Sequence, residues 1–210
     1  MRRLLTEYRQ AHGEAAVVTA MYDTELFGHW WHEGPRWLKA VLKAMAADPA
    51  FHRTTCRGCL DALPDGADAR GGPIVSLPEG SWGEGGFHWI WLNPETQWMW
   101  ERIYAAEREM AALARAHGDD PAAARPLRQA ARELLLLESS DWPFVTSTGG
   151  APDYAAARVR SHAVNFEEIA RLVRAVAAGE PVRDSPWRTL AEVEARDNPF
   201  PDIDPAWWSG

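Results

Sequence analysis

Three stretches of the chain place carboxylates beside tryptophan side chains. They are residues 22–35 (YDTELFGHWWHEGP), 79–93 (EGSWGEGGFHWIWLN) and 138–144 (ESSDWPF). A carboxylate can move a proton or accept hydrogen bonds from hydroxyl groups, and an indole combines a flat apolar face with one N–H donor. Proton transfer and the binding of a hydroxyl-rich ligand are therefore the two kinds of chemistry that these stretches suit.

Tryptophan is unusually frequent, with 12 residues in a chain of 210. Core packing alone rarely requires so many, because the indole is large and its N–H needs a partner. Flat indoles suit the apolar faces of sugar rings, which raises carbohydrate as one possible ligand class. A bulky core combined with an interface to a partner protein explains the same number, and composition alone does not choose between the two.

Asp23 is the candidate for proton transfer. It follows a continuous apolar run, residues 15–22 (AAVVTAMY), which predicts a strand buried on both faces as in a parallel sheet or barrel. In such folds the reacting groups gather at the carboxyl ends of the strands, and a desolvated carboxyl there can act as a general acid. The alternative is an aspartate that caps the following loop.

Metal and thiol chemistry are weaker readings of the sequence. His29 and His32 lie near carboxylates, but such scattered sets are common by chance, so we expect no metal and no cofactor. Cys56 and Cys59 form one C-x-x-C pair without the strand before it, or the further ligands nearby, that a redox or zinc site requires. We assign no role to this pair.

The remaining pattern is almost entirely helical. A loop near residues 65–73 marks a boundary, which divides the chain into residues 1–72 and 73–210. One buried parallel strand needs neighbours on both sides, so the sequence is typical of the end of a larger α/β protein followed by a helical domain. Apolar periodicity and end signals predict helices over residues 4–12, from 35 onward, 57–63, 93–117, 120–137, 152–178 and 187–195.

Charge and composition exclude several partners. Lysine and arginine number 22 against 30 acidic residues, a net charge of −8, so the cationic footprint of a nucleic-acid or anionic-lipid surface is missing. No apolar run reaches the roughly 18 residues of a membrane span. Two cysteines, together with an amino terminus that lacks the apolar run of a secretory signal, predict a cytoplasmic location.

The three stretches together resemble the carboxyl-terminal half of glycoside hydrolase family 57, and within it the 1,4-α-glucan branching enzymes. The resemblance rests on Y-D-T-E-L-F-G-H-W-W-x-E-G-P, on G-S-W-G-E-G-G followed by W-L-N, and on S-S-D-W-P-F. It implies a mainly α fold: the last βα part of an incomplete (β/α)7 barrel, followed by an α-helical C-terminal domain that closes over the cleft. It also implies retaining transfer of an α-1,4-glucan segment to a 6-hydroxyl group.

The resemblance assigns roles residue by residue. Asp23 matches the general acid/base, and Trp82 and Trp91 match aromatic residues of the glucan cleft. Asp141, with Trp142 beside it, matches a carboxylate that lines the same cleft.

His29 and Trp30 are further substrate-binding candidates, and of the pair Trp30 and Trp31 we expect one to face the cleft and one the core. For the remaining tryptophans we expect packing roles: Trp89, Trp98, Trp100, Trp187, Trp207 and Trp208.

The chain departs from the family in one important respect. The glutamate nucleophile belongs to motifs upstream of what this chain contains, and Glu25, Glu79 and Glu84 do not match it. We therefore expect the chain to be inactive alone, as a truncated product or as one half of a split enzyme whose partner chain carries the rest of the barrel. The alternatives are a non-catalytic α-glucan-binding or interaction module, and part of a family 57 α-amylase or 4-α-glucanotransferase.

Overall fold

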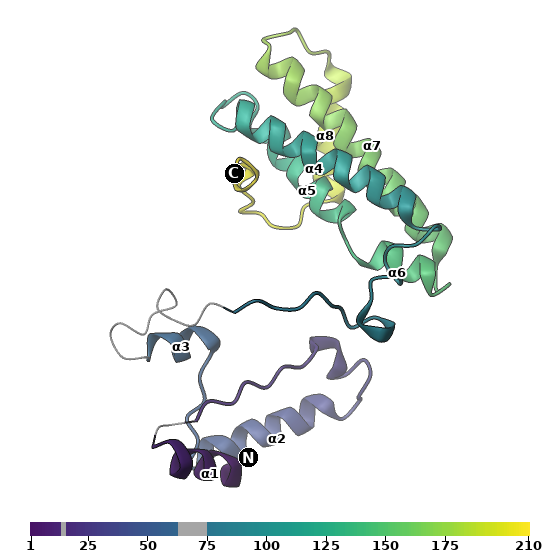
Figure 1. Cartoon of the computed structure of the whole chain (residues 1–210). Coiled ribbons are helices and arrows are strands. Elements are labelled where there is room, and N and C mark those ends of the chain that lie inside the picture. The colour runs from purple at the N-terminus through teal and green to yellow at the C-terminus, as the bar shows by residue number, and fades with distance from the viewer. Residues whose placement is uncertain (14–15, 63–74) are drawn as a thin grey trace. The chain divides into compact units, whose positions relative to one another are not determined.

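The computed structural model describes residues 1–13, 16–62 and 75–210 (Figure 1). It is mainly α-helical, and within these ranges the only strand-type pairing is an isolated bridge between Phe27 and Trp31. The described residues form two compact units, Met1–Leu77 and Pro78–Gly210. The boundary predicted between residues 72 and 73 falls outside the described residues.

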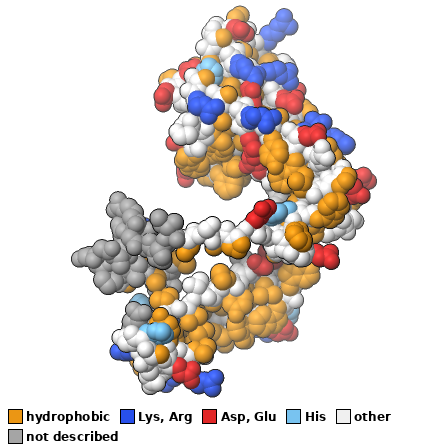
Figure 2. Space-filling view, viewed as in Figure 1, with side chains coloured by type: hydrophobic (Ala, Val, Ile, Leu, Met, Phe, Trp, Pro, Cys, Tyr) orange, Lys and Arg blue, Asp and Glu red, His pale blue; other side chains and the backbone are white. Residues whose placement is uncertain are grey.

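The Met1–Leu77 unit contains the helices α1 (Arg2–His12), α2 (Gly34–Ala47) and α3 (Cys56–Asp61). As the sequence predicts, α1 ends where Gly13 adopts a left-handed conformation (φ 76°), and a proline stands in the first turn of α2. The described part of this unit buries no hydrophobic side chain, and Figure 2 shows hydrophobic side chains gathered on its visible surface. In the described residues of this unit, every hydrophobic side chain is therefore either exposed or only half-buried.

The strand predicted over residues 15–22 is not formed. Residues 16–22 run as an extended segment without pairing, and the Met21 side chain is 85% exposed. A strand exists through hydrogen bonds to a neighbouring strand, and no described segment supplies one. The described residues contain no strand, so the βα part of a barrel is not present in them.

The Pro78–Gly210 unit is a bundle of five α-helices in its described sequence. They are α4 (Gln97–His117), α5 (Ala124–Leu137), α6 (Asp141–Ser147), α7 (Pro152–Ala177) and α8 (Asp184–Arg196). α5 packs along α7, and α4 packs against both (Figure 1). Apolar residues recur in steps of three and four along each long helix and meet in one core, which includes Met99, Met110, Leu127, Leu134, Leu137, Val159, Phe166, Ile169, Val173 and Leu190.

Two helices begin later than the sequence predicts, because capping residues first form turns. The Asn93 side chain accepts hydrogen bonds from the backbone N–H groups of Glu95 (2.9 Å) and Thr96 (3.3 Å), so α4 begins only at Gln97. Asp120 likewise accepts from the N–H of Ala122 (2.9 Å) ahead of α5. The helix α6 was not predicted at all.

Four of the six tryptophans expected to pack do so. Trp98, Trp100, Trp187 and Trp208 lie against the core, half-buried. The expectation is wrong for the other two, since Trp89 is 69% exposed and Trp207 is 67% exposed. Trp89 lies in a turn ahead of α4, and Trp207 lies in the four-residue 3-10 helix Pro205–Trp208, where its neighbour Trp208 is the one that packs on the core. Among the described residues, no helix is long and apolar enough to cross a membrane.

Candidate functional site

Trp82 and Trp91 contact each other edge to face. Their ring centroids are 4.7 Å apart and the rings stand at 87°. Trp91 is half-buried, whereas Trp82 is 73% exposed and presents its indole to solvent. Phe144 of α6 approaches Trp82 from another direction, with a centroid distance of 5.5 Å. We call Trp82, Trp91 and Phe144 the aromatic triad.

The glycine-rich loop before the triad explains how Trp82 is held. The Ser81 hydroxyl donates to the carbonyl of Phe87 (2.6 Å) and accepts from the N–H of Gly83 (3.0 Å), which closes a compact turn. A Cβ added to Gly83 would lie 2.5 Å from the Phe87 carbonyl oxygen and 3.2 Å from the Trp91 ring. Gly85 and Gly86 have positive φ, which side chains rarely tolerate. The motif S-W-G-E-G-G is therefore the sequence of one tight turn.

The residues after the loop connect it to the bundle. The Trp91 carbonyl accepts hydrogen bonds from the Thr96 hydroxyl (2.8 Å) and from the indole N–H of Trp100 (2.7 Å). The Asn93 amide donates to the Trp89 carbonyl (2.9 Å) and lies 2.8 Å from the Ser147 hydroxyl on α6. These bonds fix the W-L-N segment against both α4 and α6.

The helix α6 brings the third stretch to the same place. Asp141 is its first residue and is exposed, with the Ser139 hydroxyl donating to its carboxylate at 3.2 Å. Phe144 is three residues further on, so Asp141 and Phe144 share one face of the helix. The structure thus associates the second and third stretches through Phe144, a residue that the sequence did not single out although it lies in the S-S-D-W-P-F motif.

Trp142 points away from that face and into the bundle. Its indole N–H donates to the carbonyl of Leu136 (2.8 Å), and its ring stacks against His162 with a centroid distance of 6.4 Å. The Arg158 guanidinium lies 5.9 Å from the centre of the same ring. The one polar donor of Trp142 is therefore used within the protein, and contact with a ligand through its half-exposed ring stays a prediction.

The other candidates lie in the Met1–Leu77 unit. Asp23 is exposed and stands just before the 3-10 turn Thr24–Leu26, but its side chain makes no capping hydrogen bond. His29 stands edge-on to Trp30, with centroids 4.9 Å apart, and Trp30 is 74% exposed. Trp31 instead turns inward toward aromatic neighbours of its own unit. The meeting of Asp23 with the aromatic triad in one cleft stays a prediction.

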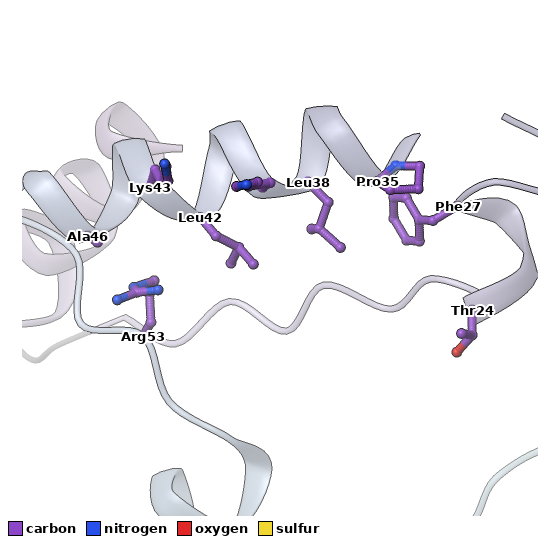
Figure 3. Close-up of a pocket in the computed structure, with 9 residues that line it drawn as sticks. Thr24, Phe27, Pro35, Leu38, Leu42, Lys43, Ala46 and Arg53 are labelled. Atoms are coloured by element: carbon purple, nitrogen blue, oxygen red, sulfur yellow. The ribbon is translucent and has the colours of Figure 1, made fainter. Parts of the chain in front are cut away.

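A groove of about 560 Å³ runs along α2 in the same unit (Figure 3). Leu38 and Leu42 point into it from α2, and Lys39, Lys43 and Arg53 add positive charge at its lining. Among the described residues that line it, there is no carboxylate and no indole. The groove therefore lacks the residue types that make the aromatic triad a candidate for sugar binding.

A buried cluster in the bundle has the composition of a metal site. Donor atoms of Glu133, His162 and Asp197 all lie within 4.8 Å of one another. An arginine already supplies the positive charge: Arg158 Nη2 is 2.9 Å from His162 Nε2 and 3.8 Å from an Asp197 oxygen. Because arginine can only donate, His162 Nε2 accepts and its proton resides on Nδ1, 2.8 Å from Glu133 Oε2. Both imidazole nitrogens are therefore satisfied without a metal.

One group near the site has an altered acidity. Burial of the Glu138 carboxyl, together with the nearby carboxylate of Glu107, raises the pKa of Glu138 to about 7. Glu138 stands at the end of α5, three residues before Asp141. Glu138 is the first residue of the third stretch, and its carboxyl is expected to titrate close to neutral pH.

An exposed indole backed by a second indole, with a carboxylate-bearing helix beside it, is a surface of the kind that carbohydrate-binding proteins use. Comparison with known proteins identifies the family of the chain. Residues 102–208 match the family described as "1,4-alpha-glucan branching enzyme, C-terminal".

Individual relatives extend the match to nearly the whole chain. The 1,4-alpha-glucan branching enzyme TK1436 of Thermococcus kodakarensis is 42% identical over 202 residues, which are 95% of this chain and 28% of the relative. Its crystal structure, in complex with glucose and additives, superposes with a TM-score of 0.76 and covers 99% of this chain and 36% of that one. The GH57-type branching enzyme of Pyrococcus horikoshii gives the same TM-score at 39% identity, over 99% of this chain and 38% of that one.

A more distant match is the alpha-amylase AmyC of Thermotoga maritima, at 25% identity and a TM-score of 0.68, over 100% of this chain and 36% of that one. The chain belongs to the GH57-type 1,4-alpha-glucan branching enzyme family, and it corresponds to the carboxyl-terminal portion of these enzymes. It spans about a third of the length of the relatives it matches.

Proposed function

We propose that this chain forms part of the glucan cleft of a branching enzyme, with the aromatic triad as its sugar-binding wall. The observation that carries the proposal is the contact between Trp82 and Trp91, in which the inner indole fixes the outer one at the surface. A fixed indole loses little conformational entropy when a sugar ring stacks on it. The exposed Asp141 carboxylate on the neighbouring helix suits charge-assisted hydrogen bonds to sugar hydroxyls.

In the proposed reaction, Asp23 is the general acid/base of a retaining transfer. Its carboxyl protonates the glycosidic oxygen of the leaving chain while a glutamate attacks the anomeric carbon and forms a covalent glycosyl-enzyme. Asp23 then takes a proton from the 6-hydroxyl of an acceptor glucan, which displaces the glutamate and creates an α-1,6 branch. Retaining enzymes hold the two carboxyl groups about 5–5.5 Å apart.

The indole wall has a second task in a transferase. Water competes with the acceptor hydroxyl for the glycosyl-enzyme, so transfer depends on excluding water from the cleft. An apolar surface built from Trp82, Trp91 and Phe144 fits that need better than a polar one. His29 and Trp30, exposed in the same unit as Asp23, are the proposed sugar contacts of the Met1–Leu77 unit.

The proposed cover of the Met1–Leu77 unit is a polypeptide segment, outside the residues of this sequence, that carries the glutamate nucleophile and the rest of the barrel. The described part of the Met1–Leu77 unit buries no hydrophobic side chain, and such a unit gains too little from burial to be stable without a cover. The exposed extended segment 16–22 and the apolar lining of the α2 groove are surfaces that such a partner would bury.

Two alternatives remain distinct from this proposal. A binding module would hold α-glucan through Trp82 and Trp91 without any transfer. An α-amylase or 4-α-glucanotransferase would share the carboxylates, but the identity to AmyC is 25% against 39–42% to the branching enzymes, which favours branching.

Two measurements test the proposal. Maltoheptaose titrated into the whole chain is expected to change its tryptophan fluorescence, and no response at millimolar sugar would contradict the glucan wall. A branching assay on amylose is expected to show no transfer by the chain alone and transfer after addition of a polypeptide that carries the missing barrel. Clear transfer by these 210 residues alone would contradict the assignment of the nucleophile to residues outside this sequence.

A further inference from the structure

We propose that Arg158 is a positioning residue for the sugar-binding wall, acting through Trp142. This inference rests on the proposed function, but its test includes a measurement that needs no sugar. Arg158 lies on α7. It contacts both the buried polar cluster of Glu133, His162 and Asp197 and the Trp142 ring on α6, the helix that carries Asp141 and Phe144.

The first step of the argument is that Arg158 is itself held firmly. Its Nη2 donates to Nε2 of the fully buried His162 (2.9 Å) and lies 3.8 Å from the buried Asp197 carboxylate. His162 is fixed in turn by Glu133, whose Oε2 is 2.8 Å from His162 Nδ1 and also accepts from the amide of Asn165 (3.1 Å). Movement within this cluster is costly, because displacing one group leaves its buried partners unpaired, in addition to Arg158 Nε, which is buried without a hydrogen-bond partner.

The second step is that Arg158 and His162 contact the Trp142 ring and hold it in place. The guanidinium carbon of Arg158 lies 5.9 Å from the centre of the Trp142 ring, within reach of a cation–π contact. His162 stacks on the same ring at 26° between planes, and the Leu136 carbonyl accepts from its N–H. Trp142 is thus held on its face by two residues of α7 and at its edge by α5.

The third step is geometric. The helix α6 has only seven residues, and Trp142 is its second, so the direction of this side chain sets the rotation of the short helix about its axis. Asp141 and Phe144 occupy a different face of the helix from Trp142, and Phe144 contacts Trp82. A change in the position of the Trp142 side chain would therefore move Phe144 and Asp141 relative to the exposed indole of Trp82.

The test compares Arg158→Met with Arg160→Met. Arg160 is a matched control, because it lies on the same helix and covers a tryptophan in the same way, at 5.2 Å, but that tryptophan, Trp98, belongs to α4 and not to α6. The whole chain is labelled with 5-fluorotryptophan, and the Trp82 fluorine signal is assigned by its loss in Trp82→Phe. We expect Arg158→Met to shift the Trp82 signal and to weaken maltoheptaose binding about three- to tenfold. Arg160→Met is expected to leave both unchanged.

A double-mutant cycle distinguishes positioning from a general loss of stability. If Arg158 acts through Trp142, Arg158→Met adds little to the loss of affinity already caused by Trp142→Leu. Arg158→Lys, which keeps a cation over the ring, is expected to bind within about twofold of the parent chain. Additive effects in the cycle, or an unchanged Trp82 signal in Arg158→Met, would overturn the proposal.

The proposal can still be tested if Arg158→Met does not fold or if the parent chain binds no maltoheptaose. If Arg158→Met does not fold, Trp142→Leu and Trp142→Phe replace it: the aliphatic variant is expected to shift the Trp82 signal more than the aromatic one, and equal signals would overturn the inference. If the parent chain binds no maltoheptaose, the proposed function fails, whereas the Trp82 fluorine signal still decides whether Arg158 positions the wall.

Discussion

The Asn93 amide lies 2.8 Å from the Ser147 hydroxyl, across 54 positions of sequence. This hydrogen bond joins the end of the second tryptophan-rich stretch to the end of α6. Asn93 also donates to the carbonyl of Trp89 and accepts from the N–H groups of Glu95 and Thr96. One buried side chain thus caps a turn, holds the loop and ties it to the helix that carries Asp141.

Replacement of Asn93 by alanine is expected to lower the free energy of unfolding by about 2–3 kcal/mol, because several buried groups lose their partner at once. Ser147→Ala, which removes one of these bonds, is expected to cost about 1 kcal/mol. Urea unfolding followed by circular dichroism measures both. The exposed Asn198 is the control, and Asn198→Ala is expected to stay within about 0.5 kcal/mol; equal effects at positions 93 and 198 would contradict the role of Asn93.

Trp82→Ala is expected to weaken maltoheptaose binding about tenfold while leaving stability nearly unchanged, because the side chain is 73% exposed and its removal opens no deep cavity. Isothermal titration calorimetry measures the affinity. Trp207 is a matched control, since it is 67% exposed in the same unit. If Trp207→Ala weakened binding as much as Trp82→Ala, the assignment of the wall to the aromatic triad would be wrong.

Gly83→Ala is expected to weaken maltoheptaose binding by disrupting the loop. The added Cβ would lie 2.5 Å from the Phe87 carbonyl, so the turn that seats Trp82 on Trp91 must open. The expected result is a changed indole signal in near-ultraviolet circular dichroism, together with several-fold weaker binding of maltoheptaose. Gly80→Ala is the matched control, because its nearest neighbour would be 3.9 Å away; identical spectra for the two variants would argue against a close-packed turn.

Glu138 makes the stability of the bundle depend on pH. Burial and the Glu107 carboxylate raise the pKa of Glu138 from 4.5 to about 7 in the folded chain, so the folded state holds a proton that the unfolded state has released between these values. Stability is therefore lost as pH rises from about 4.5 to about 7. Glu138→Gln removes this loss, and at pH 8 we expect it to be about 1–2 kcal/mol more stable than the parent, after allowance for partial solvent screening.

The increase in the free energy of unfolding caused by Glu138→Gln should vanish near pH 4.5. At that pH the Glu138 carboxyl is largely protonated in the folded chain and about half protonated in the unfolded chain. Urea midpoints at pH 4.5, 6 and 8 provide the comparison. Glu168 on α7 is exposed, and Glu168→Gln is expected to bring no comparable gain at pH 8. A gain for Glu138→Gln that did not change with pH would point to packing instead of charge.

Sequence patterns anticipated much of the helical unit, because its signals are local. Apolar steps of three and four predict α4, α5 and α7, and Gly179 follows α7 with positive φ at the predicted end. The motifs also identified the family to which the chain belongs. The short helix α6 escaped prediction, because seven residues with Pro143 among them give too little periodicity to detect.

What the sequence by itself determined is which segments are helical and which residue types are available for sugar chemistry. Tertiary structure alone decided their directions: Trp142 turns inward to Arg158 and His162, whereas Phe144, two residues later, meets Trp82. The same holds for the apolar run at residues 16–22, which forms no strand. Helical hydrogen bonds close within one segment, but strand pairing and side-chain contacts depend on partners distant in sequence, and a local pattern does not specify those partners.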